Sequence, residues 1–194
     1  MRTWSAPAPV TDAPQTTAGA LGDLVDHVTA ASPDLVLFER PVNGQWHPVT
    51  AAEWGDEVRQ LALGFVRAGV AVGDRVALMS RTRYEWTLVD FALWAAGAIS
   101  VPIYETSSAE QVSWILSDSG AVGVVVESAE HQHVVDSVRE ACPSLRDVWC
   151  IDDGAVNLIA DGATDADPGE LQTRREALDR STLATIIYTS GTTG

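Results

Sequence analysis

Residues 75–103, RVALMSRTRYEWTLVDFALWAAGAISVPI, contain two short apolar runs separated by a longer apolar and aromatic segment. The runs 76–79 and 98–103 have the length of buried strands, and the segment 84–96 has the length and composition of a helix. A strand, a helix and a second strand in this order are typical of a parallel βαβ unit with a right-handed crossover. This stretch therefore predicts an α/β fold.

The residues after this unit repeat the alternation. The run 121–126 is almost entirely apolar, as in a strand of a sheet that is covered on both faces. We therefore expect a mostly parallel sheet with helices on both faces. The acidic, glycine-rich segment 152–170 is expected to be a surface loop. The other expected elements are helices over 108–118, 132–141 and 171–178 and strands over 147–151 and 183–187.

The residues before this unit predict a different arrangement. A short helix over 21–31 is followed by a hairpin, with strands over 35–40 and 45–49 and Asn43-Gly44 at its turn. Thr50 then begins a helix, and the carboxylate of Glu53, three residues later, completes a capping box.

The apolar run 183–187 leads into a loop of hydroxyls and glycines over 188–194, YTSGTTG. Glycine lacks Cβ, so backbone N–H groups can approach an oxyanion closely, and successive N–H groups form an anion nest. A flexible Ser/Thr/Gly-rich tail would have the same composition, but such tails do not usually follow directly on a core strand. We interpret the segment as a phosphate loop. It is not a Walker A loop, because the chain has no lysine.

The segment 188–194 resembles the phosphate-binding signature of the adenylate-forming enzymes, Tyr-Thr-Ser-Gly-Thr-Thr-Gly-x-Pro-Lys-Gly, at all seven available positions. The resemblance covers about residues 20–194 and includes 73–80, 85–86 and 95–104. The segments 105–112 and 116–121 resemble long-chain fatty acyl-CoA synthetases in particular. The fold that this resemblance implies is the first subdomain of the N-terminal domain of these enzymes, truncated.

The resemblance also implies a division of the chain. Residues 1–20 are expected to be a disordered arm. Residues 21–72 would be a helix, hairpin and helix of an incomplete second subdomain, which later sequence completes in the family. Residues 73–194 would be the α/β subdomain that ends in the phosphate loop. We therefore expect an N-terminal part of a longer enzyme, in which the apolar side chains of Leu61, Phe65 and Val66 lack their usual partner.

The activity that the resemblance implies is that of an acid-thiol ligase using ATP, Mg²⁺ and coenzyme A. A fatty acid carboxylate attacks the α-phosphate of ATP, and the coenzyme A thiol then displaces AMP. The family's phosphate-loop lysine, magnesium-binding Glu and catalytic lysine come later, so no catalytic residue and no metal ligand is assigned here. We expect this chain alone to be inactive. The residues assigned to the ATP phosphates are Thr189, Ser190, Gly191, Thr192, Thr193 and Gly194.

Two other functions are compatible with the sequence. One is that of another adenylate-forming acyl- or aryl-CoA ligase. The other is that of a non-catalytic, flavodoxin-like nucleotide-binding or interaction module, which would hold a complete cofactor site within these 194 residues.

Composition restricts the partners. The net charge of −15 comes from 27 acidic residues against 12 arginines. This balance argues against nucleic-acid binding and against a polybasic attachment to anionic membranes. The sequence shows no signal peptide and no apolar stretch long enough to span a bilayer. We expect a cytoplasmic protein; peripheral membrane contact of the complete enzyme and the oligomeric state are left open.

Five further residues need an assignment. Cys142 and Cys150 are expected to be free thiols. His131 and His133 have no recognised zinc-ligand spacing and are expected to face solvent at the start of a helix. Glu105, after a strand, suits either a site wall or the entry to a helix.

Overall fold

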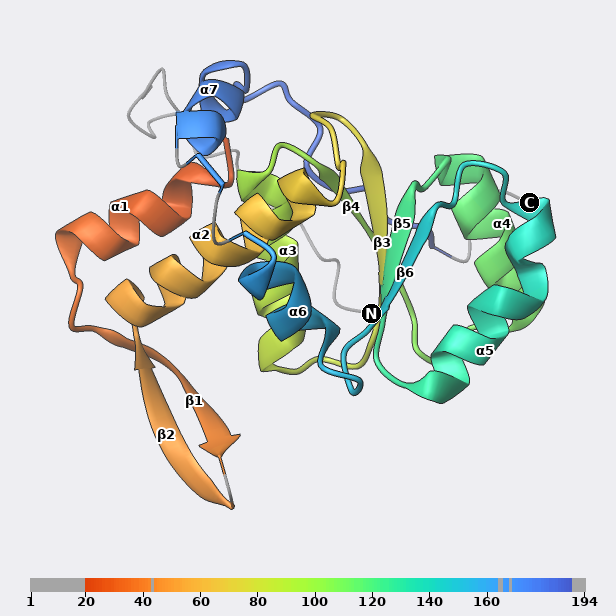
Figure 1. Cartoon of the computed structure of the whole chain (residues 1–194), viewed down its shortest axis with the longest axis horizontal. Helices are drawn as coiled ribbons and strands as arrows, with labels where there is room; N and C mark the ends of the chain where they lie inside the picture. The colour runs from red at the N-terminus through yellow and green to blue at the C-terminus, as the bar shows by residue number, and fades with distance from the viewer. Residues whose placement is uncertain (1–19, 43, 164–165, 168, 190–194) are drawn as a thin grey trace, which may run out of the picture.

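The computed structural model describes residues 20–42, 44–163, 166–167 and 169–189. At its centre is a parallel sheet of four strands in the order β4-β3-β5-β6, and helices cover both of its faces (Figure 1). The α/β fold expected from residues 75–103 is confirmed. The strands are β3 (Arg75–Met79), β4 (Ile99–Ile103), β5 (Gly123–Val126) and β6 (Asp147–Cys150).

The helices divide between the two faces of the sheet. Because successive side chains of a strand point to opposite faces, Val76 and Leu78 of β3 enter the core with α1, α2, α3 and α6. Ala77 and Met79 enter the core with α4 and α5. The helices are α1 (Asp23–Ala31), α2 (Ala51–Arg67), α3 (Tyr84–Ala95), α4 (Ala109–Ser119), α5 (Ala129–Val138), α6 (Ala155–Asp161) and α7 (Gly169–Glu176).

The N-terminal hairpin projects away from the sheet (Figure 1). Its strands β1 (Val36–Val42) and β2 (Gln45–Thr50) pair antiparallel, as predicted. Asn43 lies outside the described residues, and Gly44 has a φ of 79°. The predicted capping box of α2 is confirmed, because Glu53 N–H donates to Thr50 Oγ1 at 3.3 Å and Thr50 N–H donates to Glu53 Oε2 at 2.8 Å.

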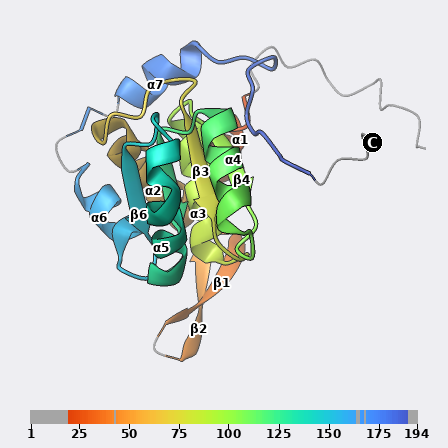
Figure 2. The ribbon, with the colours of Figure 1, turned by 90° about the vertical axis from the view of Figure 1, so that its right-hand side faces the viewer.

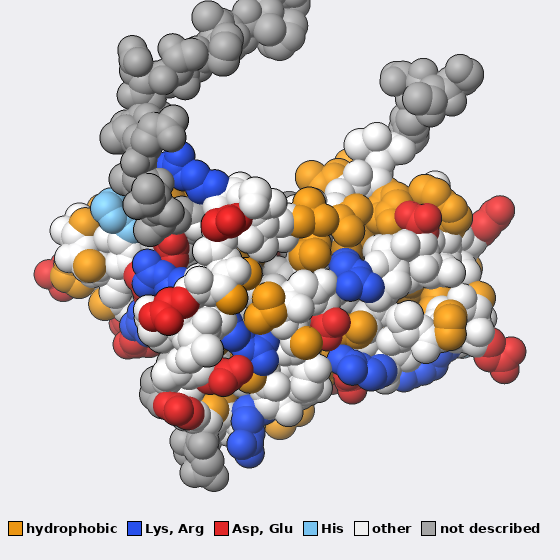
Figure 3. All heavy atoms as spheres, turned by 90° about the horizontal axis from the view of Figure 1, so that it is seen from above, with side chains coloured by type: hydrophobic (Ala, Val, Ile, Leu, Met, Phe, Trp, Pro, Cys, Tyr) orange, Lys and Arg blue, Asp and Glu red, His pale blue; other side chains and the backbone are white. Residues whose placement is uncertain are grey.

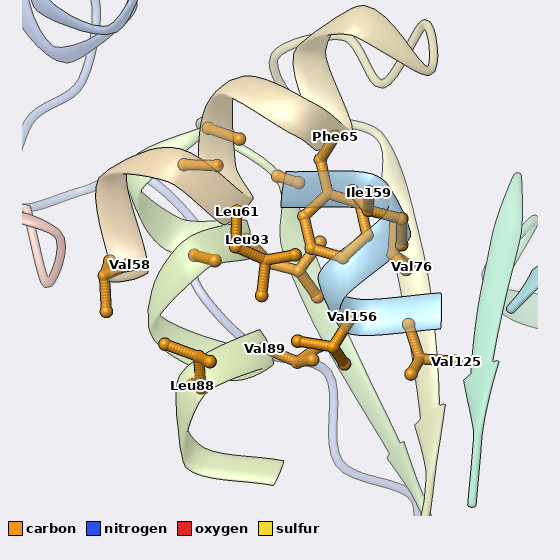
Figure 4. Close-up of a cluster of buried hydrophobic side chains, with 14 of the residues drawn as sticks. Val58, Leu61, Phe65, Val76, Leu88, Val89, Leu93, Val125, Val156 and Ile159 are labelled. Carbon is orange, nitrogen blue, oxygen red and sulfur yellow. The ribbon is translucent and has the colours of Figure 1, made fainter. Parts of the chain in front are cut away.

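Residues 155–161 form helix α6, so the prediction of a surface loop over 152–170 is wrong. Val156 and Ile159 lie on one side of this helix and are buried against α2 (Figure 4). The helix comes so close that a Cβ on Gly64 of α2 would overlap the carbonyl group of Ile159. The segment is acidic overall and has only a short apolar pattern, Val156 and Ile159. These side chains stabilise a helix here because they pack against α2.

The apolar face of α2 is covered, contrary to the expectation for Leu61 and Phe65. Both side chains are fully buried, and Val66 packs partly buried against the same core. Figure 4 shows Leu61 and Phe65 among side chains of α3, α6 and the sheet. The Phe65 ring also meets the Trp149 ring edge-on, with centroids 5.5 Å apart. The assignment of residues 21–72 and 73–194 to separate subdomains stays a prediction.

Helix α7 has no buried residue among those described. Two of its arginines attach it to the rest of the structure. Arg174 Nη1 donates to the carbonyls of Val70 at 2.8 Å and Ala96 at 3.0 Å, where α2 and α3 have just ended. The carbonyl of Ala96, the C-cap residue of α3, has no partner within that helix, so a guanidinium satisfies it well. Arg175 forms an ion pair with Asp26 of α1. On the face seen from above in Figure 3, arginine side chains lie beside acidic ones.

We predict that Gly64→Ala destabilises the protein by about 1–3 kcal/mol, because the added methyl group forces α6 away from α2. In the interior of an exposed helix the same change would stabilise by about 0.5–1 kcal/mol. Urea unfolding measures the difference. Gln60→Ala, at an exposed position of the same helix, is the control. A stabilised Gly64→Ala variant would contradict the close contact of α2 and α6.

Hydrogen exchange tests the division of the chain. Separate subdomains predict that amides throughout residues 21–72 exchange faster than those of 75–150, since they would open as a unit of their own. Mass spectrometry of peptides from both ranges in the monomer measures this. Equal protection of α2 and β3 would show one cooperative core and contradict the division at residue 73.

Candidate functional site

An open cleft of about 460 Å³ lies at the carboxyl ends of β3 and β4. Ser80 and Thr82 follow β3, Tyr104 and Glu105 follow β4, and residues 187–188 form another side. The connection after β3 leads to α3 on one face of the sheet, whereas the connection after β4 leads to α4 on the other. Ligands of open α/β sheets bind where connections diverge in this way. The cleft is therefore the candidate binding site.

The segment before the predicted phosphate loop runs along the outer side of β4 (Figure 2). The expected strand over 183–187 is reduced, in the described part of the chain, to a single parallel bridge between Thr185 and Ser100. Ser100 N–H donates to the Ala184 carbonyl at 3.0 Å, and Ile186 N–H donates to the Ser100 carbonyl at 3.0 Å. Beyond this pair the ladder does not continue, and Ile187 is 69% exposed.

Tyr188 attaches the end of this segment to α4. Its hydroxyl donates to Asp118 Oδ2 at 2.6 Å, and its ring meets the Trp114 ring edge-on with centroids 5.0 Å apart. Burial, followed by the hydrogen bond to Asp118, raises the pKa of Tyr188 to about 12. The phenol is therefore a neutral hydrogen-bond donor at physiological pH.

Of the residues predicted to bind the ATP phosphates, the structure describes Thr189 alone. Thr189 is exposed and directly follows Tyr188, which lines the cleft. Ser190, Gly191, Thr192, Thr193 and Gly194 lie outside the described residues. Their role in phosphate binding stays a prediction, and the structure locates the point beside the cleft from which they continue.

Glu127, which the sequence analysis did not identify, holds the loop after β3. It follows β5 and is only 7% exposed. Its Oε2 accepts a hydrogen bond from Arg81 N–H at 2.9 Å and one from Ser80 Oγ at 3.3 Å, while its Oε1 pairs with Arg81 Nε at 2.9 Å. The signal was an acidic residue at the carboxyl end of the apolar run 121–126. One wall of the cleft is thus held by a buried carboxylate.

Arg83 connects the same loop to the end of β6. Its Nε donates to Glu85 at 2.7 Å, and its Nη1 donates to Asp152 at 2.8 Å. The hydrogen bond to Glu85 is the main cause of the raised pKa of Arg83, and the one to Asp152 adds to it. This guanidinium serves the loop and is not free to neutralise a ligand.

His131 fixes the loop after β4. Its Nε2 is 3.1 Å from the Glu105 carbonyl oxygen, and its Nδ1 is 2.9 Å from Ser128 Oγ. His131 is half-buried, contrary to the expectation that it faces solvent, whereas His133 is exposed. Helix α4 is capped by Ser108, which exchanges hydrogen bonds with Gln111. Glu105 precedes this helix entry, and it also lines the cleft.

The remaining chemical groups are buried or scattered. Cys142 and Cys150 are unpaired and buried, and burial raises the pKa of both thiols. In the part of the chain that the structure describes, no three His, Cys, Asp or Glu side chains are grouped to hold a metal ion. The described helices include none with the length and apolar character needed to cross a bilayer.

A parallel sheet with a cleft at its carboxyl edge, beside a segment that leads into a Gly/Thr loop, defines the class of nucleotide-binding α/β domains. Residues 25–194 match the family model described as "AMP-binding enzyme". The chain therefore belongs to the AMP-binding enzyme family.

Similar proteins show what share of a longer family member this chain covers. Along its whole length it is 43% identical to the long-chain-fatty-acid–CoA ligase FadD15 of Mycobacterium bovis and to the FadD15 ligase of Mycobacterium tuberculosis. It spans 32% of each of those proteins.

Solved structures share the fold. The long-chain-fatty-acid–CoA ligase FadD1 of Archaeoglobus fulgidus superposes with a TM-score of 0.71 at 20% identity, covering 89% of this chain and 34% of that one. The N-terminal domain of FACL13 from Mycobacterium tuberculosis gives a TM-score of 0.68 at 27% identity, covering 77% of this chain and 38% of that domain.

We predict that Tyr188→Phe weakens the pH dependence of stability in alkali. Because the pKa of Tyr188 is raised, the folded state holds the phenol proton more tightly than the unfolded state does. This contribution is complete below the ordinary tyrosine pKa of about 10 and is lost as the pH rises toward about 12. The free energy of unfolding should therefore fall less steeply in the variant.

Urea unfolding at a series of alkaline pH values measures this effect. Tyr104→Phe is the matched control, since the Tyr104 side chain is 74% exposed. Equal alkaline slopes for wild type and Tyr188→Phe would show that the bond to Asp118 does not stabilise the folded chain.

Proposed function

We propose that this chain forms the phosphate-binding part of an ATP-dependent long-chain fatty acid–CoA ligase. The observation that carries the proposal is the position of Tyr188, the first residue of the predicted phosphate loop, at a cleft on the carboxyl edge of a parallel sheet. The 43% identity to the FadD15 ligases supports the substrate class. Because the chain spans about a third of those relatives, the activity belongs to a longer protein of this kind.

The proposed reaction has two steps. The fatty acid carboxylate attacks the α-phosphate of ATP, which forms an acyl-adenylate and releases pyrophosphate. The thiol of coenzyme A then attacks the acyl carbon and displaces AMP. The energetic requirement is stabilisation of charge on the phosphate oxygens together with in-line positioning.

The residues at the cleft suit phosphate in their chemistry. Thr189 and, in the proposal, Ser190, Gly191, Thr192, Thr193 and Gly194 supply neutral hydroxyl and backbone N–H donors to the β- and γ-phosphates. The cleft is also lined by Ser80 and Thr82, whose side chains carry hydroxyl groups. Mg²⁺ would enter with ATP and supply positive charge there; no residue of this chain is assigned to it or to coenzyme A. A cytoplasmic location is part of the same proposal.

We predict that replacing Thr192 and Thr193 together by alanine weakens binding of MgATP at least tenfold. A hydrogen bond to a charged group contributes about 1.5–3 kcal/mol, and both hydroxyls would be lost. Isothermal titration calorimetry measures the affinity. Thr173→Ala on α7 is the control, because its hydroxyl donates to Gly169 within the same helix. Unchanged affinity of the double variant would contradict the phosphate assignment.

We predict that the chain alone releases no pyrophosphate from ATP, Mg²⁺ and palmitate above a protein-free blank. Catalytic groups typically contribute orders of magnitude in rate, and none is assigned within these residues. A coupled pyrophosphate assay measures the rate. Turnover that disappears in the Thr192 and Thr193 double variant would show that the site is more complete than proposed.

A further inference from the structure

Ser100 is a buried hydroxyl in the middle of an edge strand. Its side chain is 0% exposed, and the other buried residues of β4 are Ile99, Val101 and Ile103. Its Oγ lies 3.0 Å from Thr185 Oγ1. The same residue makes both backbone hydrogen bonds of the bridge to 184–186. A hydroxyl at such a position is costly unless it is paired, so its partners deserve an explanation.

The two hydroxyls form one hydrogen bond, in which either oxygen can be the donor. On α3, Trp94 Nε1 donates to the Ala184 carbonyl at 2.9 Å. Helix α3 and strand β4 thus both hold residues 184–186.

The pair of hydroxyls fixes the register of residues 184–186 against β4, which the backbone hydrogen bonds alone do not fix. In strands, residues two apart point to the same face, so a slip by two residues would keep the backbone bridge and place Leu183 or Ile187 opposite Ser100. The Ser100 hydroxyl would then lose its hydroxyl partner in a buried position. Such a slip would also move the start of the phosphate loop by about 7 Å along β4.

We propose that Ser100 and Thr185 are positioning residues, which lock residues 184–186 in register with β4 and so set the position from which the predicted phosphate loop continues. The placement of the loop matters for ligand binding only if residues 189–194 bind phosphate, so this part rests on the proposed function. The register lock itself does not.

Hydrogen exchange tests the lock directly. Ser100→Ala should speed exchange of the Ile186 amide about tenfold, as expected for loss of a buried hydrogen bond, and leave the amides of β3 and β5 unchanged. Ser119→Ala is the matched control, because the Ser119 hydroxyl is also buried but donates to Ile115 within α4. Equal effects of the two variants along the chain would overturn the proposal.

Variants of Thr185 separate positioning from simple stability. Thr185→Ser keeps a hydroxyl opposite Ser100 Oγ and should keep the slow exchange of the Ile186 amide. Thr185→Val has similar volume without the hydroxyl and should speed that exchange as Ser100→Ala does. If Thr185→Val leaves the Ile186 amide protected, the hydroxyl pair is not part of the lock and the proposal fails.

Binding of MgATP, measured by calorimetry, tests the consequence for the loop. Ser100→Ala should weaken binding about tenfold, since the loop must first be brought into register, and Ser119→Ala should not. Equal affinities of wild type and Ser100→Ala would overturn the positioning role. If wild type itself binds no MgATP, the proposed function fails for this chain, while hydrogen exchange still decides whether the register lock exists.

Discussion

The divergence of two neighbouring connections is the constraint on which the rest of this structure depends. Right-handed crossovers require that a strand added on one side of β3 carries its helix on one face, and a strand added on the other side carries it on the opposite face. Helix α3 therefore lies on the face opposite α4 and α5 (Figure 1). The cleft at the carboxyl ends of β3 and β4 follows from this topology, as do the positions of Ser80 and Glu105 on its two walls.

Buried polar groups hold the segments around the cleft. Glu127 accepts from the backbone, hydroxyl and guanidinium groups of residues 80–81, and Ser100 joins Thr185 to the sheet. Hydrogen bonds to charged groups are directional, so they define the position of a loop more narrowly than apolar contacts can. Apolar burial holds the helices on the sheet, whereas polar pairs set the loops at its edge.

Sequence patterns predicted the elements that are buried on both faces. They failed for elements whose structure depends on contact with a single neighbouring element. The strands 76–79 and 98–103 are buried on both faces and were predicted within a residue of their observed ends. Helix α6 was missed, because its apolar period is short and gains meaning only from Gly64 across the contact. The run 183–187 looked like a full strand, but its outer side has no neighbour among the described residues and a single bridge forms.

The sequence by itself determined the α/β class, the parallel order of elements from residue 75 onward, the capping box at Thr50 and the family, because these depend on local periodicity and contiguous motifs. Only the tertiary structure decided that Leu61 and Phe65 of α2 are covered, and that Glu127 and His131 hold the walls of the cleft. Those contacts join residues far apart in the chain. Their energy depends on distance and burial in three dimensions, which no local pattern of residues contains.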